Sequence, residues 1–400
     1  MNYLVACDDV FPDQPTGAGR VAWDIACAMR DRGHHVTHLS PDHRPGAPDD
    51  DTEIIDGITV VRFAPPAPRR LDLQRLGRLV AQARVTAGAR LGDAHWDVLH
   101  MHSPVTGRGV LDALTDVTRV VYTMHSPIVL ENRINWANQG FAGRVKMMLG
   151  LNALKRLERS VVRGSDVVHT LSQFTSTHLR EFHGEHTPVE VIPHWRREDW
   201  RRTVDRAEAR RKLGWPVDVP TLFTLRRHVH RMGLDTAIDA AAPLCKAGRC
   251  RLVIAGDGPL RISLTQRARE AGCDESQVDL PGRLSDDDLM LAYQAADLFL
   301  LPTRALECFG LIVVEAMAFG CPVLGTDVGA IPELLSPVTP NLIVPPGDAD
   351  SMRLKLEAVL DGALELPDSE LLERYVTDRF EKSKVLLQYL RLLERTDRAP

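Results

Sequence analysis

Cysteine is scarce in this chain of 400 residues, and its seven copies form none of the C-x-x-C pairs typical of zinc or redox modules. An odd and unpatterned set of cysteines predicts reduced thiols inside a cell. No run of about 18 apolar residues occurs, so no membrane-spanning helix is expected. The first residues, MNYLVACDDVF, lack the basic and apolar segments of a secretory signal. These absences predict a cytoplasmic protein.

The chain also lacks a surplus of positive charge, with 49 Lys and Arg against 54 Asp and Glu and a net charge of −5. A protein that binds nucleic acid through bulk charge is therefore disfavoured. Apolar residues make up 44% of the sequence and charged residues 26%. These are ordinary globular proportions, with enough apolar material for large cores.

Short apolar runs alternate with amphipathic stretches along most of the chain. The first are a strand over residues 3–7 and a helix over 20–32, followed by strands in HHVTHLS and GITVVRF with an acidic loop between them. A helix over 69–92 and a long helical stretch ending near 162 come later. Strands separated by helices indicate βαβ units and a parallel sheet.

The alternating series occurs twice, and a charged break near residues 193–210 separates the two copies. We therefore predict an α/β protein with two Rossmann-like, doubly wound domains, about 1–192 and 193–376. Ligands bind at the carboxyl ends of parallel strands, so two such domains in tandem are expected to face each other across a cleft. The loops that follow the strands are where functional residues are expected.

The strongest local signal is the segment PTRALECFGLIVVEAMAFG, in which Glu307 precedes a helix that begins near Gly310 and Glu315 lies on its second turn. The first N–H groups of a helix and its dipole favour a phosphate. A carboxylate at Glu315 can accept hydrogen bonds from both hydroxyls of a ribose. The alternative is that Glu307 is a helix-start acid and Glu315 a satisfied surface residue.

This segment resembles the signature of the family 4 retaining glycosyltransferases of the GT-B fold, in which seven residues separate two glutamates. Further similar segments lie in family order from about residue 2 to 392, and they are TGAG, RGHHV, WDVLHMH, YTMHS, GSDVVHTLS, VEVIP, LVIAGDGP, VDLPGRLSDDDLMLAYQAADLFLLPT and NLIVPPGD. The resemblance implies that a C-terminal helix near 380–395 crosses back to the first domain. It also implies a donor site on the second domain and an acceptor site on the first.

In the family, the second glutamate, here Glu315, holds the donor ribose, and the first, Glu307, contacts the transferred sugar. The resemblance implies that the backbone amides of Phe309, Gly310 and Leu311 meet the sugar and the distal phosphate.

The phosphate clamp departs from the family pattern, which is G-R followed after four residues by K-G. Arg227 aligns with the family arginine, Met232 occupies the lysine position, and Arg231 precedes it. We predict that Arg231 replaces the lysine. Cations are needed here because a nucleoside diphosphate gains negative charge as it leaves.

Three further positions follow from the resemblance. His125 aligns with a family histidine beside the anomeric end of the donor sugar, where an imidazole can donate or accept a hydrogen bond. Gly17 and Gly19 belong to a glycine loop that lets the backbone approach the donor and acceptor. Gly282 and Arg283 align with the loop that packs against the nucleobase.

The resemblance implies a retaining, hexosyltransferase-like enzyme that uses front-face displacement, with the leaving phosphate taking the proton of the acceptor. No cofactor or metal is expected. The His-x-His pairs at 100–102 and 228–230 lack a third ligand at a recognisable spacing, which disfavours zinc. The donor base, sugar and acceptor cannot be read from the sequence.

Several alternatives stay open. A sugar-nucleotide epimerase or a disaccharide phosphorylase has the same fold, and a non-catalytic nucleotide-sugar binder can partner another transferase. A nicotinamide-dependent oxidoreductase is disfavoured because about ten residues separate the glycine loop from the first strand. The stretches 69–90 and 144–163 each carry six basic residues and one acid, which suits either a solvated face or contact with an anionic membrane.

Overall fold

The computed structural model describes residues 1–400 except 14–15, 45–50, 68–74, 138–139, 186 and 395–400. The chain divides into two compact units. The N-terminal unit comprises residues 1–193 with 386–400, and the C-terminal unit comprises residues 194–385. Each unit is a parallel-sheet α/β domain, so the predicted fold class is confirmed.

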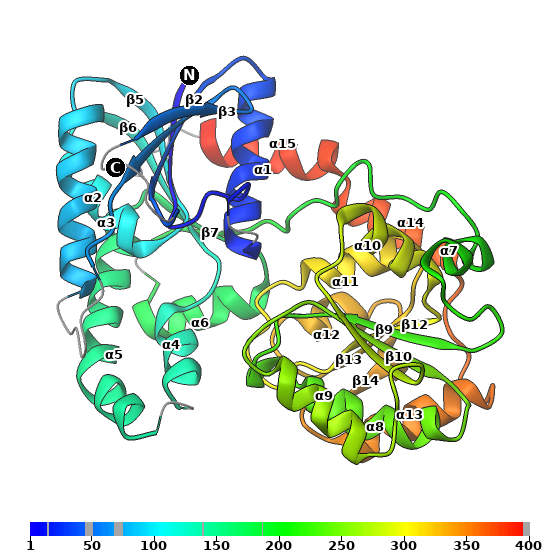
Figure 1. The fold of residues 1–400 in the computed structure, drawn as a ribbon. Coiled ribbons are helices and arrows are strands. Elements are labelled where there is room, and N and C mark those ends of the chain that lie inside the picture. Colours follow the sequence, from blue (N-terminus) through cyan, green and yellow to red (C-terminus); the bar gives the residue numbers. More distant parts are fainter. Residues whose placement is uncertain (14–15, 45–50, 68–74, 138–139, 186, 395–400) are drawn as a thin grey trace. The chain divides into compact units, whose positions relative to one another are not determined.

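The N-terminal unit has a sheet of eight strands in the order β3-β4-β2-β1-β5-β6-β7-β8. In sequence order the strands are β1 (Asn2–Ala6), β2 (His35–Pro41), β3 (Thr52–Ile55), β4 (Ile58–Phe63), β5 (Trp96–Met101), β6 (Val117–Met124), β7 (Val167–Thr170) and β8 (Val189–Val191). Helices cover both faces of this sheet (Figure 1), and they are α1 (Gly17–Asp31), α2 (Arg75–Leu91), α3 (Pro104–Ala113), α4 (Ile128–Ala137), α5 (Gly140–Arg163) and α6 (Gln173–His183). Because both faces are covered, β1 is a continuous apolar run that is buried from Tyr3 to Ala6.

The first helix begins three residues earlier than the sequence predicts. The hydroxyl of Thr16 accepts a hydrogen bond from the backbone N–H of Gly19 at 3.0 Å, which caps α1 at residue 16. Gly17 and Gly19 therefore lie in the first turn of a helix rather than in a loop. Similarly, the long helical stretch is two helices, α4 and α5.

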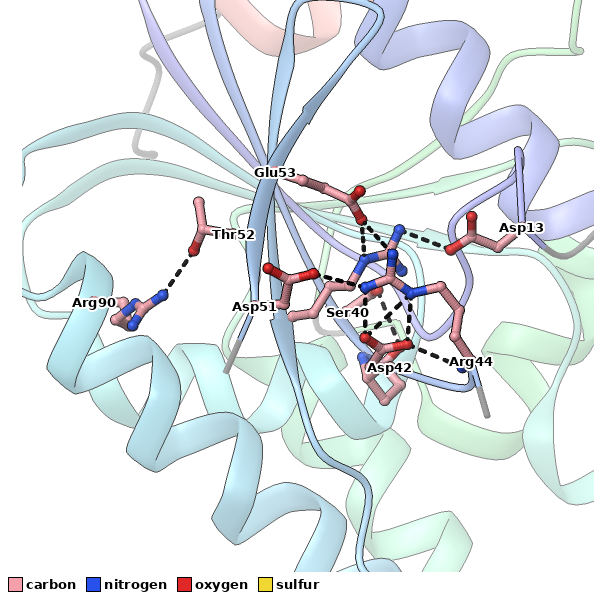
Figure 2. Close-up of polar contacts among 10 residues, drawn as sticks. Asp13, Ser40, Asp42, Arg44, Asp51, Thr52, Glu53 and Arg90 are labelled. Carbon is pink, nitrogen blue, oxygen red and sulfur yellow. Dashed lines mark hydrogen bonds and ion pairs between the residues drawn. The ribbon is translucent and has the colours of Figure 1, made fainter. Parts of the chain in front are cut away.

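The acidic stretch between the second and third predicted strands is not a simple solvated loop. Its end forms β3, which pairs antiparallel with β4. Arg44 forms ion pairs with Asp42 at 2.7 Å and Asp51 at 2.9 Å, and the buried Arg62 pairs with Glu53 at 2.6 Å (Figure 2). The carboxylates of Asp51 and Glu53 are therefore ion-pair partners of Arg44 and Arg62.

The C-terminal unit has a parallel sheet of six strands in the order β11-β10-β9-β12-β13-β14. Its strands are β9 (Thr221–Leu225), β10 (Arg251–Ala255), β11 (Val278–Gly282), β12 (Leu298–Leu301), β13 (Val323–Thr326) and β14 (Ile343–Val344). Its helices are α7 (Arg206–Leu213), α8 (Leu234–Lys246), α9 (Arg261–Glu270), α10 (Asp286–Ala295), α11 (Leu311–Ala318), α12 (Ile331–Leu335), α13 (Ala349–Leu360) and α14 (Ser369–Phe380), with short 3-10 turns at His230–Met232 and Pro340–Leu342. Helices α8 and α13 lie on one side of the sheet and α10 and α11 on the other (Figure 1).

The last helix, α15 (Lys382–Glu394), begins in the range of the C-terminal unit, and its residues from Leu386 onward belong to the N-terminal unit. The carbonyl of Leu392 accepts a hydrogen bond from Arg119 of β6 at 2.8 Å. The Tyr389 hydroxyl lies 3.2 Å from Nε2 of His169 on β7. These contacts hold the end of the chain against the N-terminal sheet.

Buried histidines are expected to make the N-terminal unit sensitive to acid. Burial lowers the pKa of His38 to about 3, and it holds the pKa of His100 and His102 well below the usual 6.5. The unfolded chain takes up protons on these rings near pH 6.5, whereas the folded chain does not. The free energy of unfolding therefore falls as the pH drops from 6.5 toward 3, by up to about 1.4 kcal/mol per pH unit for each histidine.

The substitution His38→Phe tests this pH dependence. Neither ring nitrogen of His38 has a hydrogen-bond partner among the described residues, so phenylalanine removes the titration without removing a hydrogen bond. In urea denaturation between pH 5 and 7.5, the slope against pH is expected to be shallower, by an amount that approaches about 1.4 kcal/mol per unit at the acid end of this range. The exposed His35 provides the matched control, and His35→Phe should leave the slope unchanged. Equal slopes for His38→Phe and the wild type would contradict the expectation.

Candidate active site

The strand order of the C-terminal unit reverses between β9 and β12. Ligands of doubly wound sheets bind at the carboxyl ends of the strands at such a point. The loops that follow these two strands, 226–233 and 302–310, contain five of the site residues that the sequence predicts, which are Arg227, Arg231, Glu307, Phe309 and Gly310. The two loops are in direct contact, because the backbone N–H of Arg304 donates to the carbonyl of Arg231 at 2.8 Å.

Glu307 is held from both its backbone and its side chain. Its carbonyl accepts a hydrogen bond from the N–H of Ala330 at 2.8 Å. Gly329 has a φ of +62°, and a Cβ at this position would collide with the same carbonyl. The carboxylate of Glu307, whose side chain is 15% exposed, pairs with Nη2 of Arg226 at 2.8 Å. The carboxylate is therefore fixed in position at the carboxyl edge of the sheet.

Helix α11 begins where the sequence predicts, with Gly310 as its N-cap at a φ of +87°. No side chain caps this end, and the N–H of Val313 already donates to the carbonyl of Gly310 at 2.9 Å, which leaves the N–H groups before Val313 as those that have no intrahelical acceptor in an α-helix. Phe309 is buried and packs edge-on against Phe380, and Leu311 starts the helix. The partial positive charge of this terminus lies directly after Glu307 in the chain.

Glu315 is buried rather than at the surface, with 6% of the residue exposed. Its Oε2 accepts a hydrogen bond from the hydroxyl of Tyr293 on α10 at 3.1 Å. A carboxylate has about four acceptor positions, so such a group can accept hydrogen bonds from more than one hydroxyl at once.

The predicted cations take up different positions. Arg227 is exposed, and Nη1 of Arg231 donates to the carbonyl of Leu306 at 2.9 Å. The arginine that reaches Glu307 is Arg226, which is not among the residues predicted from the sequence. The only signal for it in the sequence is a second arginine directly after β9, at a position where the family pattern has glycine.

Two further predicted residues lie after β11. Gly282 has a φ of +93°, and its carbonyl accepts a hydrogen bond from the N–H of Gly256 at 2.7 Å. Arg283 follows it with an exposed side chain. Both residues therefore lie at the carboxyl end of the edge strand.

In the N-terminal unit, His125 follows β6 and His102 follows the adjacent parallel strand β5. Nδ1 of His102 lies 2.9 Å from Nε2 of His125, so one ring donates an N–H to the other. The rings are stacked with their centroids 5.2 Å apart. Burial and neighbouring histidines lower the pKa of His102, which keeps its ring neutral near pH 7. His125 is thus one of the residues predicted from the resemblance, whereas its partner His102 is not.

The two glycines after β1 have different surroundings. Gly17 is exposed, and a Cβ there would meet nothing within 4 Å. Gly19 is buried, and a Cβ there would lie 2.9 Å from the Thr16 hydroxyl and 3.0 Å from Cβ of Asp9. Packing alone therefore accounts for glycine at 19 but not at 17.

Two doubly wound α/β domains, the second with a glutamate pair around the start of a helix, define the GT-B class of glycosyltransferases. Residues 15–200 match the family described as Glycosyltransferase Family 4, and residues 205–376 match Glycosyl transferases group 1. The chain therefore belongs to the family 4 glycosyltransferases, and the enzyme class expected from the sequence is confirmed.

Relatives and solved structures agree with this assignment. The chain is 30% identical over 290 residues to D-inositol 3-phosphate glycosyltransferase 1 of Catenulispora acidiphila, covering 70% of this chain and 67% of the relative. Two other curated glycosyltransferases are matched over 53% and 54% of their length. The fold is similar to sucrose-phosphate synthase from Thermosynechococcus elongatus, with a TM-score of 0.79, 20% identity and 98% of each chain covered. It is also similar to Anabaena HepE solved with UDP and glucose, with a TM-score of 0.73, 20% identity and coverage of 98% and 99%.

Proposed function

We propose that the protein moves a sugar from a nucleotide-sugar donor to a hydroxyl acceptor, with retention of anomeric configuration and without a metal ion. The observation that carries this proposal is the half-buried Glu307 before the uncapped start of α11 together with the buried Glu315 on that helix. In the proposed complex, Glu315 accepts hydrogen bonds from the ribose and Glu307 from the transferred sugar. The amides of residues 309–311 bind the distal phosphate.

In the proposed reaction, the bond between the anomeric carbon and the phosphate oxygen breaks, and the acceptor oxygen bonds to the same face of the sugar. The acceptor proton passes to the leaving phosphate. The helix start, Arg227 and a second arginine of the loop 226–231 stabilise the negative charge on the diphosphate, which is the task that a metal ion performs elsewhere.

The remaining predicted residues have proposed roles in the same complex. Gly282 and Arg283 lie against the nucleobase, and His125 hydrogen-bonds near the anomeric end of the sugar. Gly17, which is open on its Cβ side, allows the backbone to approach the substrates. The N-terminal unit binds the acceptor.

Binding of nucleoside diphosphates tests the donor site. A panel of UDP, GDP, ADP and TDP with their common sugars is expected to include one base that stabilises the protein in EDTA. At 100 times its dissociation constant, such a ligand adds about 2.7 kcal/mol to the free energy of unfolding. Glu315→Ala should weaken that binding about 10-fold or more, because hydrogen bonds to a charged group are lost. Glu270→Ala on the exposed side of α9 is the matched control. Unchanged binding by Glu315→Ala would contradict the assignment.

Analysis of the reaction products distinguishes a glycosyltransferase from a phosphorylase, an epimerase or a non-catalytic binding protein. A phosphorylase of this fold requires inorganic phosphate and a disaccharide, whereas an epimerase releases an epimerised sugar without an acceptor. A partner protein without catalysis binds the nucleotide sugar and leaves it intact. Transfer of the unaltered sugar to an alcohol with retained configuration is the expected result.

We also propose that the basic helices rest on an anionic membrane surface. Val85 on α2 and Met148 on α5 are 66% and 72% exposed, and the exposed Arg84 and Arg144 lie near them in sequence; residues 69–74 of the predicted stretch lie outside the described part of the chain. Among the described helices, none combines the length and apolarity needed to cross a bilayer. Co-sedimentation with phosphatidylglycerol vesicles, and not with phosphatidylcholine vesicles, is expected at low salt. No co-sedimentation with either would overturn the proposal.

A further inference from the structure

Two exchanges distinguish this chain from the family pattern of its phosphate loop. Arg226 stands where the pattern has glycine, and Met232 stands where it has lysine. The loop has therefore lost a cation at one position and gained one six residues earlier. Taken alone, each exchange is unremarkable, but together they conserve the charge of the loop.

The structure brings the two exchanged side chains into contact. The Nη2 nitrogen of Arg226 lies against the sulfur of Met232 and 3.0 Å from the hydroxyl of Thr303. The same nitrogen pairs with Glu307 at 2.8 Å. The guanidinium therefore occupies the space beside residue 232, next to the carboxylate that is proposed to contact the sugar.

Arg226 is also poorly satisfied for a buried cation. Only 8% of the residue is exposed, and its Nε, which is also buried, has no hydrogen-bond partner among the described residues. Removing a guanidinium from water is unfavourable unless several acceptors surround it. A buried arginine with unused donor capacity, paired with the glutamate that lies three residues before an uncapped helix N-cap, suits binding of an anion.

We propose that Arg226 is the second cation of the donor diphosphate site and replaces the missing lysine of the motif. This inference rests on the proposed function, and it differs from the sequence-based assignment to Arg231. The side chain of Arg231 donates to the carbonyl of Leu306 and its own carbonyl accepts from Arg304, so Arg231 ties together the two loops. Arg226 carries the charge toward the ligand.

The test compares binding of a nucleoside diphosphate and its monophosphate by calorimetry in EDTA, using the base found with the wild type. Arg226→Met should weaken the diphosphate about 10- to 100-fold, because a charge-assisted contact is lost, and leave the monophosphate within about threefold. Retained monophosphate binding shows that the unit is folded. Arg226→Gln, which keeps hydrogen-bonding capacity toward Thr303 and removes the charge, should show the same loss. Arg249→Met, which changes an exposed pair with Asp361, is the matched control and should change neither affinity.

A second variant that restores the lysine of the family pattern tests whether Arg226 replaces that lysine. The diphosphate preference is the ratio of the affinity for the nucleoside diphosphate to the affinity for its monophosphate. Arg226→Gly should lower this ratio, and Arg226→Gly combined with Met232→Lys should raise it again by about tenfold or more. The inference is overturned if Arg226→Met keeps the wild-type preference, if Arg231→Met alone removes it, or if the double variant is no better than Arg226→Gly. A wild type that binds no nucleoside diphosphate would defeat the proposed function and this inference together. A wild type that binds one while Arg226→Met behaves identically would defeat this inference alone.

Discussion

Glu307→Ala lowers kcat/KM for the nucleotide sugar by about 100-fold or more and destabilises the C-terminal unit. The rate falls because a fixed carboxylate no longer accepts hydrogen bonds from the sugar in the transition state. Stability falls by about 2 kcal/mol because the buried guanidinium of Arg226 loses its counter-charge. This value is below the usual range for buried pairs, since the Glu307 side chain is 15% exposed. Steady-state kinetics and urea denaturation measure the two effects.

A double-variant cycle separates the two consequences of losing Glu307. Adding Arg226→Met to Glu307→Ala removes both charges, so the free energy of unfolding should recover toward the wild type while turnover stays low. Glu307→Gln keeps the shape and one acceptor oxygen and should lie between the alanine variant and the wild type. Wild-type kcat/KM in Glu307→Ala would contradict the site assignment.

His125→Ala is the second large effect, with an expected fall in kcat of about 100-fold or more, as is typical for loss of a positioned imidazole. The affinity for the nucleoside diphosphate should change little, because the residues proposed to bind it belong to the C-terminal unit. His102→Phe should lower kcat by about tenfold, because it removes the ring nitrogen 2.9 Å from Nε2 of His125 that helps to fix the orientation and the tautomer of that imidazole.

A spectroscopic readout distinguishes positioning from simple loss of structure. Nitrogen-15 NMR of the imidazoles should show a single tautomer of His125 in the wild type and a mixture in His102→Phe. His95→Phe changes a ring that is 48% exposed and should leave kcat and the spectrum unchanged. A single tautomer and unchanged kcat in His102→Phe would show that His102 does not position His125.

The features that could be predicted from the sequence are those encoded locally. Glycine at 310 after a strand and a charged residue predicts the start of α11, and the structure confirms it. The repeated alternation of short apolar runs and helices predicts two parallel sheets in the same way. The start of the helix depends on neighbouring residues, and the sheets depend on a spacing of apolar residues that can be read directly from the sequence.

The features that were missed depend on residues far apart in the chain. The Arg226–Glu307 pair joins residues 81 positions apart, and the His102–His125 pair joins residues 23 apart on neighbouring strands. No local pattern distinguishes Arg226 from Arg227, because the direction of the strand end decides which of them faces Glu307. Pairing of this kind becomes visible only when the order of the strands is known.

Errors at element boundaries have local causes. The glycines of the first turn conceal the cap at Thr16, so the sequence pattern predicts a start of α1 that is too late. The short sequence of β3, TEII, follows three aspartates and shows little alternation, so the pattern predicts a loop there. Its pairing with β4 and the ion pair between Glu53 and Arg62 stabilise it instead.

Release of nucleoside diphosphate from a panel of nucleotide sugars in EDTA tests the central claim most directly. Slow transfer to water or to a simple alcohol is sufficient to detect it with a coupled assay. We predict that one nucleotide sugar is cleaved in EDTA, that Glu307→Ala removes most of that activity, and that the transferred sugar keeps its anomeric configuration by proton NMR. Cleavage that requires a divalent cation, inversion of configuration, or no cleavage of any donor would contradict the account.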